Sequence, residues 1–245
     1  MERFLFKSAR KKKGLSVIYR NFVIFVLVVS ICGCVAPSSV YHSSSALSVP
    51  MNSSVLILLP DVLISLLNAG GNAEPRSDWS KEVQASLEVA IQGHLYQKGV
   101  RFIPYGKSEL TDNHVGILRQ ANVLMDAIEL SQVKQGIASE RIYAFGKGSL
   151  EDLKPFDADY ALVTVLRANK ASGGRTAVAI LGAFAGATIE TNTAEFRVGL
   201  FDLRDGQLKW ANFDPLALAD IGNVISASEK AWEKAITHIL VEIPL

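Results

Sequence analysis

The side chains of this chain that could do chemistry do not gather in a recognisable motif. No two of its histidines have the spacing of metal ligands, and no serine stands in a Gly-x-Ser-x-Gly elbow. Asp157 and Asp159 could act as an acid–base pair, although solvated acids at the start of a strand are the simpler interpretation. We therefore expect no catalytic residue, no metal and no cofactor. The histidines are His42, His94, His114 and His238.

A phosphate-binding loop is also not expected. Gly106-Lys107-Ser108 resembles the end of a P-loop, in which a first glycine five residues before the last one allows the turn that surrounds the phosphate. That position is Arg101 here. We predict an ordinary loop after a strand and no nucleotide site.

The thiol chemistry lies at the end of a short apolar run. Phe22–Ile31 follows seven basic residues, and the small Gly33 comes shortly after it. A basic segment, a short apolar segment and a small residue are typical of a secretory signal. A membrane-spanning helix would need roughly 20 apolar residues, and Arg20 prevents extension of the run.

Ile31-Cys32-Gly33-Cys34 resembles the lipobox of bacterial lipoprotein signals. The resemblance implies that Cys34 receives diacylglycerol and that residues 1–33 are a signal peptide removed before it. An uncleaved anchor with incidental cysteines is the alternative. Val35 follows the cysteine, where Asp would resemble an inner-membrane retention signal. The resemblance therefore implies attachment to the periplasmic face of the outer membrane.

Removal of residues 1–33 changes the charge of the chain. The leader holds seven of the 25 basic residues and one of the 24 acidic residues, so the mature chain has a net charge of −5. This charge gives no reason to expect nucleic-acid binding. Because Cys32 leaves with the leader and Cys34 carries lipid, we expect no disulfide.

The mature chain divides into a tether and one domain. Residues 34–54 are rich in Ser and Pro, which predicts a flexible tether. Residues 55–245 alternate strand and helix patterns, which predicts a single α/β (α+β) domain with a mixed sheet flanked by helices. Trp79 and Trp232 lie on apolar stripes that we expect to pack on the sheet. The expected strands are Val55–Leu59, Val100–Pro104, Tyr160–Leu166 (covered on both faces), Phe196–Leu203 and Gln207–Asn212.

Two longer patterns suggest a family. Phe156-Asp-Ala-Asp-Tyr-Ala-Leu-Val enters the expected central strand, and Phe201-Asp-Leu-Arg-Asp-Gly-Gln-Leu-Lys-Trp closes a hairpin. Together they resemble the periplasmic domain shared by the curli-secretion lipoprotein CsgG and the N-terminal domain of TolB. The resemblance implies a sheet flanked by helices and an assembly role in the envelope, without an active site. A CsgG pore uses alternating amphipathic hairpins, whereas Thr176–Ile189 is uniformly apolar.

Thr176–Ile189 leaves three interpretations open. Gly182, Ala183, Phe184 and Gly186 fall in a G-x-x-x-G pattern, which permits close approach between helices. The segment could be a buried strand or helix of the core, a subunit contact, or a hairpin that touches the membrane. We favour the core, because apolar runs are usually buried.

The sequence therefore predicts a non-enzymatic, lipid-anchored envelope protein. We expect it to be an accessory or interaction component of an outer-membrane or periplasmic complex, with a protein partner or a second copy as its contact. A subunit of a transport or secretion assembly is one alternative. A periplasmic enzyme with a dispersed site is the other.

Overall fold

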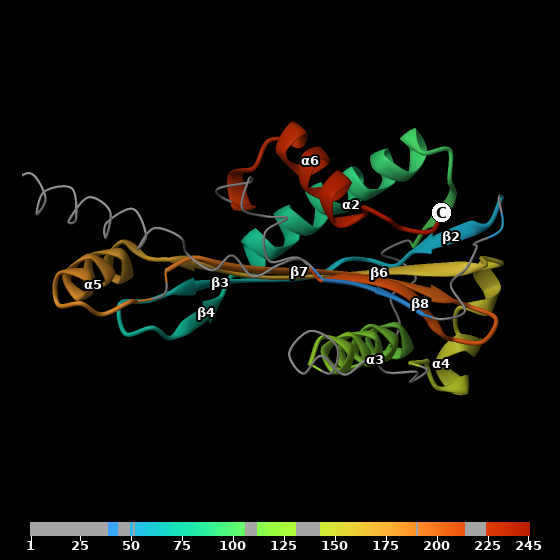
Figure 1. Ribbon diagram of the computed structural model, residues 1–245, viewed down its shortest axis with the longest axis horizontal. Helices are drawn as coiled ribbons and strands as arrows, with labels where there is room; N and C mark the ends of the chain where they lie inside the picture. The colour runs from blue at the N-terminus through green and yellow to red at the C-terminus, as the bar shows by residue number, and fades with distance from the viewer. Residues whose placement is uncertain are drawn as a thin grey trace, which may run out of the picture. The chain divides into compact units, whose positions relative to one another are not determined.

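The computed structural model describes residues 39–43, 50, 52–105, 112–130, 143–189, 191–213 and 224–245. The predicted signal peptide and Cys34 lie outside these residues. The described chain forms one mixed sheet with helices on both of its faces (Figure 1), which confirms the predicted fold class. The strands are β1 (Ser39–His42), β2 (Ser54–Ile57), β3 (Asp61–Leu67), β4 (Ala73–Pro75), β5 (Arg101–Pro104), β6 (Tyr160–Ala171), β7 (Thr193–Asp202) and β8 (Leu208–Phe213). The helices are α2 (Ser77–Gln97), α3 (Asp112–Ile128), α4 (Lys147–Glu151), α5 (Gly173–Phe184) and α6 (Glu229–Ile239), with short 3₁₀ turns at η3 (Lys154–Phe156) and η5 (Val224–Ser226).

Strand β6 is the axis of the sheet. Its first half pairs in parallel with β2, and its second half pairs in parallel with β3. The two partners follow one line along β6, interrupted near Pro60, which has no N–H to give to a ladder. On its other side, β6 pairs antiparallel with β7 over ten residues. The sheet then continues through β8 to β1, and β5 lies outside β2.

Each face of the sheet buries its own apolar core. Alternate residues of β6 serve the two sides, with Tyr160 and Leu162 in one cluster and Ala161 and Val163 in the other. Helices α2 and α6 cover the first face, and α3 and α4 lie on the opposite face (Figure 1). The predicted burial of this strand on both sides is confirmed.

A β-bulge in β8 allows that strand to serve both cores. Leu200 pairs with Trp210, yet the next residue, Phe201, pairs with Leu208, so Lys209 is the extra residue. Leu208 consequently packs in the α3 core and Trp210 in the α2–α6 core, although strict alternation would place them on one side.

The tether prediction is wrong for Ser39–His42, which forms edge strand β1 antiparallel to β8. Tyr41 is buried in the α3 core, and Val40 packs against the opposite core. The Ser-rich composition concealed these two side chains, and the free edge of β8 supplies the hydrogen bonds that a short strand needs.

The two tryptophan helices pack on the sheet, as expected, and they share one face. Trp232 of α6 is buried, and Trp79 of α2 is half-buried beside the core. The guanidinium of Arg76 lies 4.1 Å from the Trp79 ring centroid, and Lys170 Nζ lies 5.4 Å from it. Trp79 therefore lies at the rim of the core, beneath two cations.

Candidate functional site: helix α5 and the groove between α2 and α6

Helix α5 is inserted between β6 and β7, at the end of the sheet. The Ser172 N–H donates to the Leu67 carbonyl at 2.9 Å, which ties the entry of α5 to β3. The Ser172 hydroxyl then accepts from the Arg175 N–H at 3.2 Å and caps the helix. Ser172-Gly173-Gly174, a sequence typical of a turn, is therefore the cap and first residues of a helix.

The core interpretation of Thr176–Ile189 is wrong, because no residue of α5 is buried. Arg175, Ala179 and Gly182 are half-covered and form the side turned toward the domain. The opposite side is exposed to solvent, and the exposed fraction reaches 69% at Leu181 and 87% at Phe184.

The exposed side of α5 is one apolar stripe. Ala177, Ile180, Leu181 and Phe184 follow the i, i+3, i+4, i+7 spacing of a single helix face, and all four are exposed. In an ordinary helix of a globular domain this spacing marks the buried side. We call these four residues the α5 stripe. An exposed apolar patch of this kind makes the α5 stripe a candidate contact surface.

The two glycines of the G-x-x-x-G pattern serve to end α5. The Ala187 N–H donates to the Gly182 carbonyl at 2.8 Å, and the Gly186 N–H donates to the Ala183 carbonyl at 3.1 Å, which together make a Schellman motif. Gly186 has a φ of 77°, where a side chain would be strained. A Cβ on Gly182 would lie 2.5 Å from Ile189 Cδ1. Both glycines therefore let residues 186–189 turn back against the helix, so local geometry accounts for the pattern.

The predicted contact residues on α5 thus divide into two groups. Ala183 and Phe184 are exposed, while Gly182 and Gly186 shape the end of the helix. The stripe residues Ala177, Ile180 and Leu181 complete the surface. Their spacing could have been read as a face from the sequence, but not the direction in which that face points.

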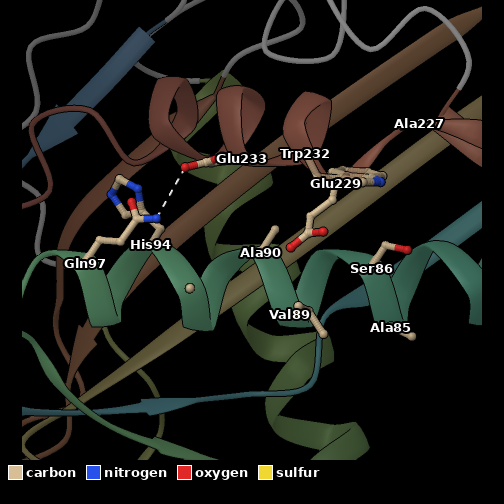
Figure 2. Close-up of a pocket in the computed structure, with 11 residues that line it drawn as sticks. Ala85, Ser86, Val89, Ala90, His94, Gln97, Ala227, Glu229, Trp232 and Glu233 are labelled. Carbon is tan, nitrogen blue, oxygen red and sulfur yellow. Dashed lines mark hydrogen bonds between the residues drawn. The ribbon is translucent and has the colours of Figure 1, made fainter.

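A second feature is a groove of about 480 Å³ between α2 and α6. Figure 2 shows His94 and Gln97 on α2 facing Glu233 on α6, with the Gln97 amide nitrogen 3.3 Å from the Glu233 carboxylate. Trp232 lines the same groove and belongs to the core beneath it.

His94 is the buried titratable group of this groove. Among the described residues, its Nε2 has no hydrogen-bond partner. Burial and the nearby charge of Lys98 lower its pKa, and the attraction of Glu233 opposes them only in part. His94 is therefore a neutral side chain at neutral pH, and it packs in the seam between the two helices.

The predicted acid pair has separate structural tasks. The Asp159 carboxylate accepts from the Ser54 N–H at 2.8 Å and from its hydroxyl at 3.0 Å, which joins β6 to the start of β2. Asp157 ends a 3₁₀ turn with a φ of 48°. Asp159 thus fastens two strands through its carboxylate, whereas Asp157 shapes the end of a turn through its backbone.

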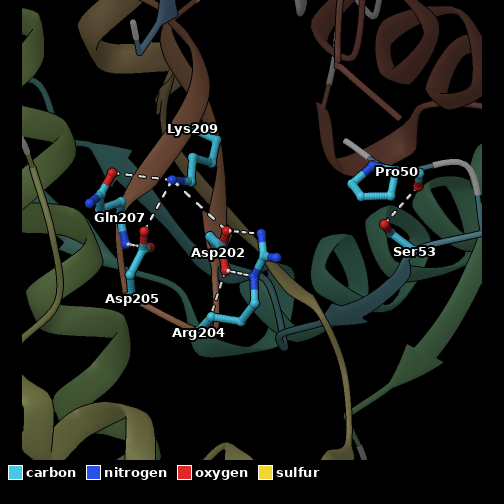
Figure 3. Close-up of polar contacts among 7 residues, drawn as sticks. All are labelled: Pro50, Ser53, Asp202, Arg204, Asp205, Gln207 and Lys209. Atoms are coloured by element: carbon cyan, nitrogen blue, oxygen red, sulfur yellow. Dashed lines mark hydrogen bonds and ion pairs between the residues drawn. The ribbon is translucent and has the colours of Figure 1, made fainter. Parts of the chain in front are cut away.

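The β7–β8 turn carries a buried ionic cluster, shown in Figure 3. Burial alone would raise the pKa of Asp202, but hydrogen bonds from Arg204 and the charge of Lys209 outweigh it and hold the pKa below its usual range. Lys209, the bulge residue, also lies 3.2 Å from Asp205. The contacts therefore pair the two buried charges of this cluster, Asp202 and Lys209, with exposed partners on the turn.

The remaining predicted features give no further site. Within the described ranges, no three His, Cys, Asp or Glu residues are placed to hold a metal ion. The described helices include none with the length and apolar character needed to cross a membrane. Gly106-Lys107-Ser108 lies outside the described residues, as does Cys34.

Comparison with known proteins yields distant structural likenesses only. No family model and no curated protein sequence match the chain. The PelC dodecamer from Paraburkholderia phytofirmans aligns with a TM-score of 0.36 at 6% identity, over 82% of this chain and 96% of that one. A point variant of the same dodecamer gives a TM-score of 0.34 at 8% identity, over 83% and 94%. The LpoB C-terminal domain from Salmonella enterica gives 0.27 at 12% identity, over 69% and 83%. All three TM-scores are below 0.5, so the proposals below rest on the residues of this chain.

Proposed function

We propose that this chain is a non-enzymatic, lipid-anchored protein of the bacterial envelope. Cys34 holds it at the periplasmic face of the outer membrane, after removal of residues 1–33. Its domain serves as an accessory or interaction component of an envelope complex. The observation that carries this proposal is the α5 stripe, an apolar helix face directed away from the domain, which is explained when an envelope surface outside the domain covers it.

The position of α5 supports a contact role over a role in folding. The two cores are built from the sheet with α2, α6 and α3, and neither of them includes a residue of α5. A helix that adds no buried side chain, yet exposes Leu181 and Phe184, lowers the solubility of the domain without stabilising its fold. The presence of such a helix is understandable if another surface covers these side chains.

The engagement of the acidic residues supports a non-enzymatic protein. Asp159 is held by Ser54, and Asp202 by Arg204 and Lys209, in contacts that fasten strands and a turn. A general acid or base needs a carboxyl group that can reach a substrate proton. These carboxylates face their own chain.

The anchor is tested by metabolic labelling with a radioactive fatty acid in a diderm host. The unaltered protein should incorporate label, and Cys34→Ser should abolish incorporation and leave the leader uncleaved. Cys32→Ser is the matched control and should remain labelled, since serine suits that position of a lipobox. Full labelling of the Cys34→Ser protein would contradict the proposed anchor. In-cell cross-linking of the lipidated protein should give a defined product with another envelope protein, and a purely monomeric pattern would contradict the accessory role.

A further inference from the structure

Strand β1 and helix α5 point to the same end of the sheet. Through successive pairings, Ser39 lies in one row with Phe213, Arg197 and Val165. His42, at the other end of β1, lies in one row with Leu162 by the same route. Moving backwards along β1 is therefore moving forwards along β6, toward Ala171 and α5. The chain enters the domain from the side on which α5 stands.

The length of chain before β1 brings Cys34 within reach of that end. Four residues lie between Cys34 and Ser39, and the five steps from Cys34 to Ser39 span at most about 17 Å. The rise along β6 from Val165 to Ala171 is about 20 Å, and the three strand spacings between β1 and β6 add roughly 14 Å across the sheet. Extended in that direction, the stretch ends just short of the level of Ala171, so acyl chains on Cys34 can enter a bilayer close to the level at which α5 begins.

The composition of α5 suits a lipid surface. Between Lys170 and Glu190 the sequence has a single charge, Arg175, and no acidic residue. Lys170 and Arg175 stand where the helix joins the sheet, which is the depth at which lipid phosphates would meet it. A helix of 12 residues is about 18 Å long, too short to cross a hydrocarbon core of about 30 Å. It is long enough to lie along the boundary between the lipid headgroups and the hydrocarbon core.

The size of the surface favours lipid over a second copy of the chain. A helix roughly 18 Å long and about 10 Å across offers a few hundred Å² on one side. Each partner in a typical stable protein complex buries about 800 Å². Contact with a bilayer needs no such minimum area. The lipid anchor already attaches the protein to the membrane, and the α5 stripe needs only to increase the membrane affinity.

We propose that the α5 stripe lies in the headgroup region of the bilayer beside the lipid on Cys34, as a second membrane contact that fixes the orientation of the domain. This inference rests on the proposed lipid anchor. It assigns the exposed Ile180, Leu181 and Phe184 to lipid, and it leaves the α2–α6 and α3 sides of the sheet open to a protein partner.

The test uses the mature lipoprotein in vesicles of phosphatidylethanolamine and phosphatidylglycerol. With the Cys34 thiol carrying lipid and Cys32 removed, Leu181→Cys provides one free thiol for an environment-sensitive fluorophore. Val123→Cys on α3 is the matched control, because Val123 is 67% exposed and Leu181 is 69% exposed. Lipids with brominated acyl chains should quench the label at position 181 at least about threefold more than the label at position 123.

A charged variant tests the stripe itself. Ala177 is one turn before Leu181 on the same face, and an acidic residue early in a helix does not disfavour it. Ala177→Asp in the Leu181→Cys protein should reduce quenching to the level of the Val123 control without lowering the melting temperature. Equal quenching at positions 181 and 123 would overturn the proposal. A fluorophore shift at position 181 that depends on protein concentration and is independent of vesicles would also overturn it, since a second copy would then cover α5.

Mass spectrometry of the same sample separates the two proposals. A lipidated protein without selective quenching refutes the α5 contact and leaves the anchor intact. A protein without lipid refutes the anchor. In that case Cys34→Ser removes the unlipidated thiol, so that the fluorophore reacts only at position 181 or 123. If the α5 contact holds, brominated lipids in added vesicles should still quench the label at position 181 more than the label at position 123. Equal quenching at the two positions overturns the α5 contact.

Discussion

Replacing Trp232 by alanine removes the largest side chain that α6 contributes to the core. Trp232 is 2% exposed and belongs to the cluster that joins α2 and α6 to the sheet. Truncation of a fully buried aromatic residue costs about 3–5 kcal/mol. For a domain of this size, 1 kcal/mol shifts the melting temperature by roughly 2–4 °C. We therefore expect Trp232→Ala to lower the melting temperature by roughly 6–20 °C.

The same substitution at Trp79 is the control. Trp79 is half-buried at the rim of the same core, and its ring lies under Arg76 and near Lys170. Exposed cation–π contacts contribute about 0.5–1 kcal/mol each, and partial burial adds about the same again. Trp79→Ala should cost roughly 1.5–3 kcal/mol, which is less than the loss at Trp232.

The comparison is made by thermal and urea unfolding of the unlipidated chain beginning at Ser38, with circular dichroism and fluorescence as separate probes. Coincident transitions by the two probes establish that one domain unfolds. Equal losses at the two positions, or a larger loss at Trp79, would refute the assignment of Trp232 to the core and Trp79 to its rim.

Two further predictions follow from buried histidines and from the end of α5. Burial lowers the pKa of His94 and of His114, so the unfolded chain, whose histidines titrate near 6.5, binds more protons. The melting temperature should fall as pH decreases through 6.5, and by less in His94→Gln; a rise over this interval would count against neutral buried histidines. Gly186→Ala should cost roughly 1–2 kcal/mol locally because of its positive φ, seen as faster hydrogen exchange in α5. Gly93→Ala, in the interior of α2 with open space around it, should instead stabilise by about 0.5–1 kcal/mol, and equal effects would refute the assigned helix end.

The sheet could be predicted because its strands carry their own evidence. Tyr160–Leu166 is apolar on both of its faces apart from Thr164, which is the pattern of a strand covered on both sides. The Asp205-Gly206 turn fixes the β7–β8 hairpin. Pro60 lies at the break between β2 and β3, and both pieces pair with β6.

The errors arise where pairing or exposure depends on distant residues. Ser39–His42 becomes a strand because β8 has a free edge, and a short Ser-rich segment gives no sign of that edge. Asp78 is of a type common at helix caps, but it lies inside the first turn of α2 and pairs with Arg76 at 2.6 Å. The direction of the α5 stripe was misjudged because a periodic apolar face has the same sequence pattern whether the domain, a partner or lipid covers it.

The exposure of α5 follows from the relative lengths of strands and helices. Strand β6 has 12 residues and extends about 40 Å, whereas α2, the longest helix on its face, has 21 residues and extends about 31 Å. The core on each face therefore ends before the strand does, and residues of β6 beyond Ala168 are only half-buried. A helix attached after Ala171 stands beyond the reach of α2 and α6. Burying the α5 stripe within the domain would require a helix that extends past the end of the core. None of the described helices does so, and a cover for the stripe would therefore have to come from outside the described domain.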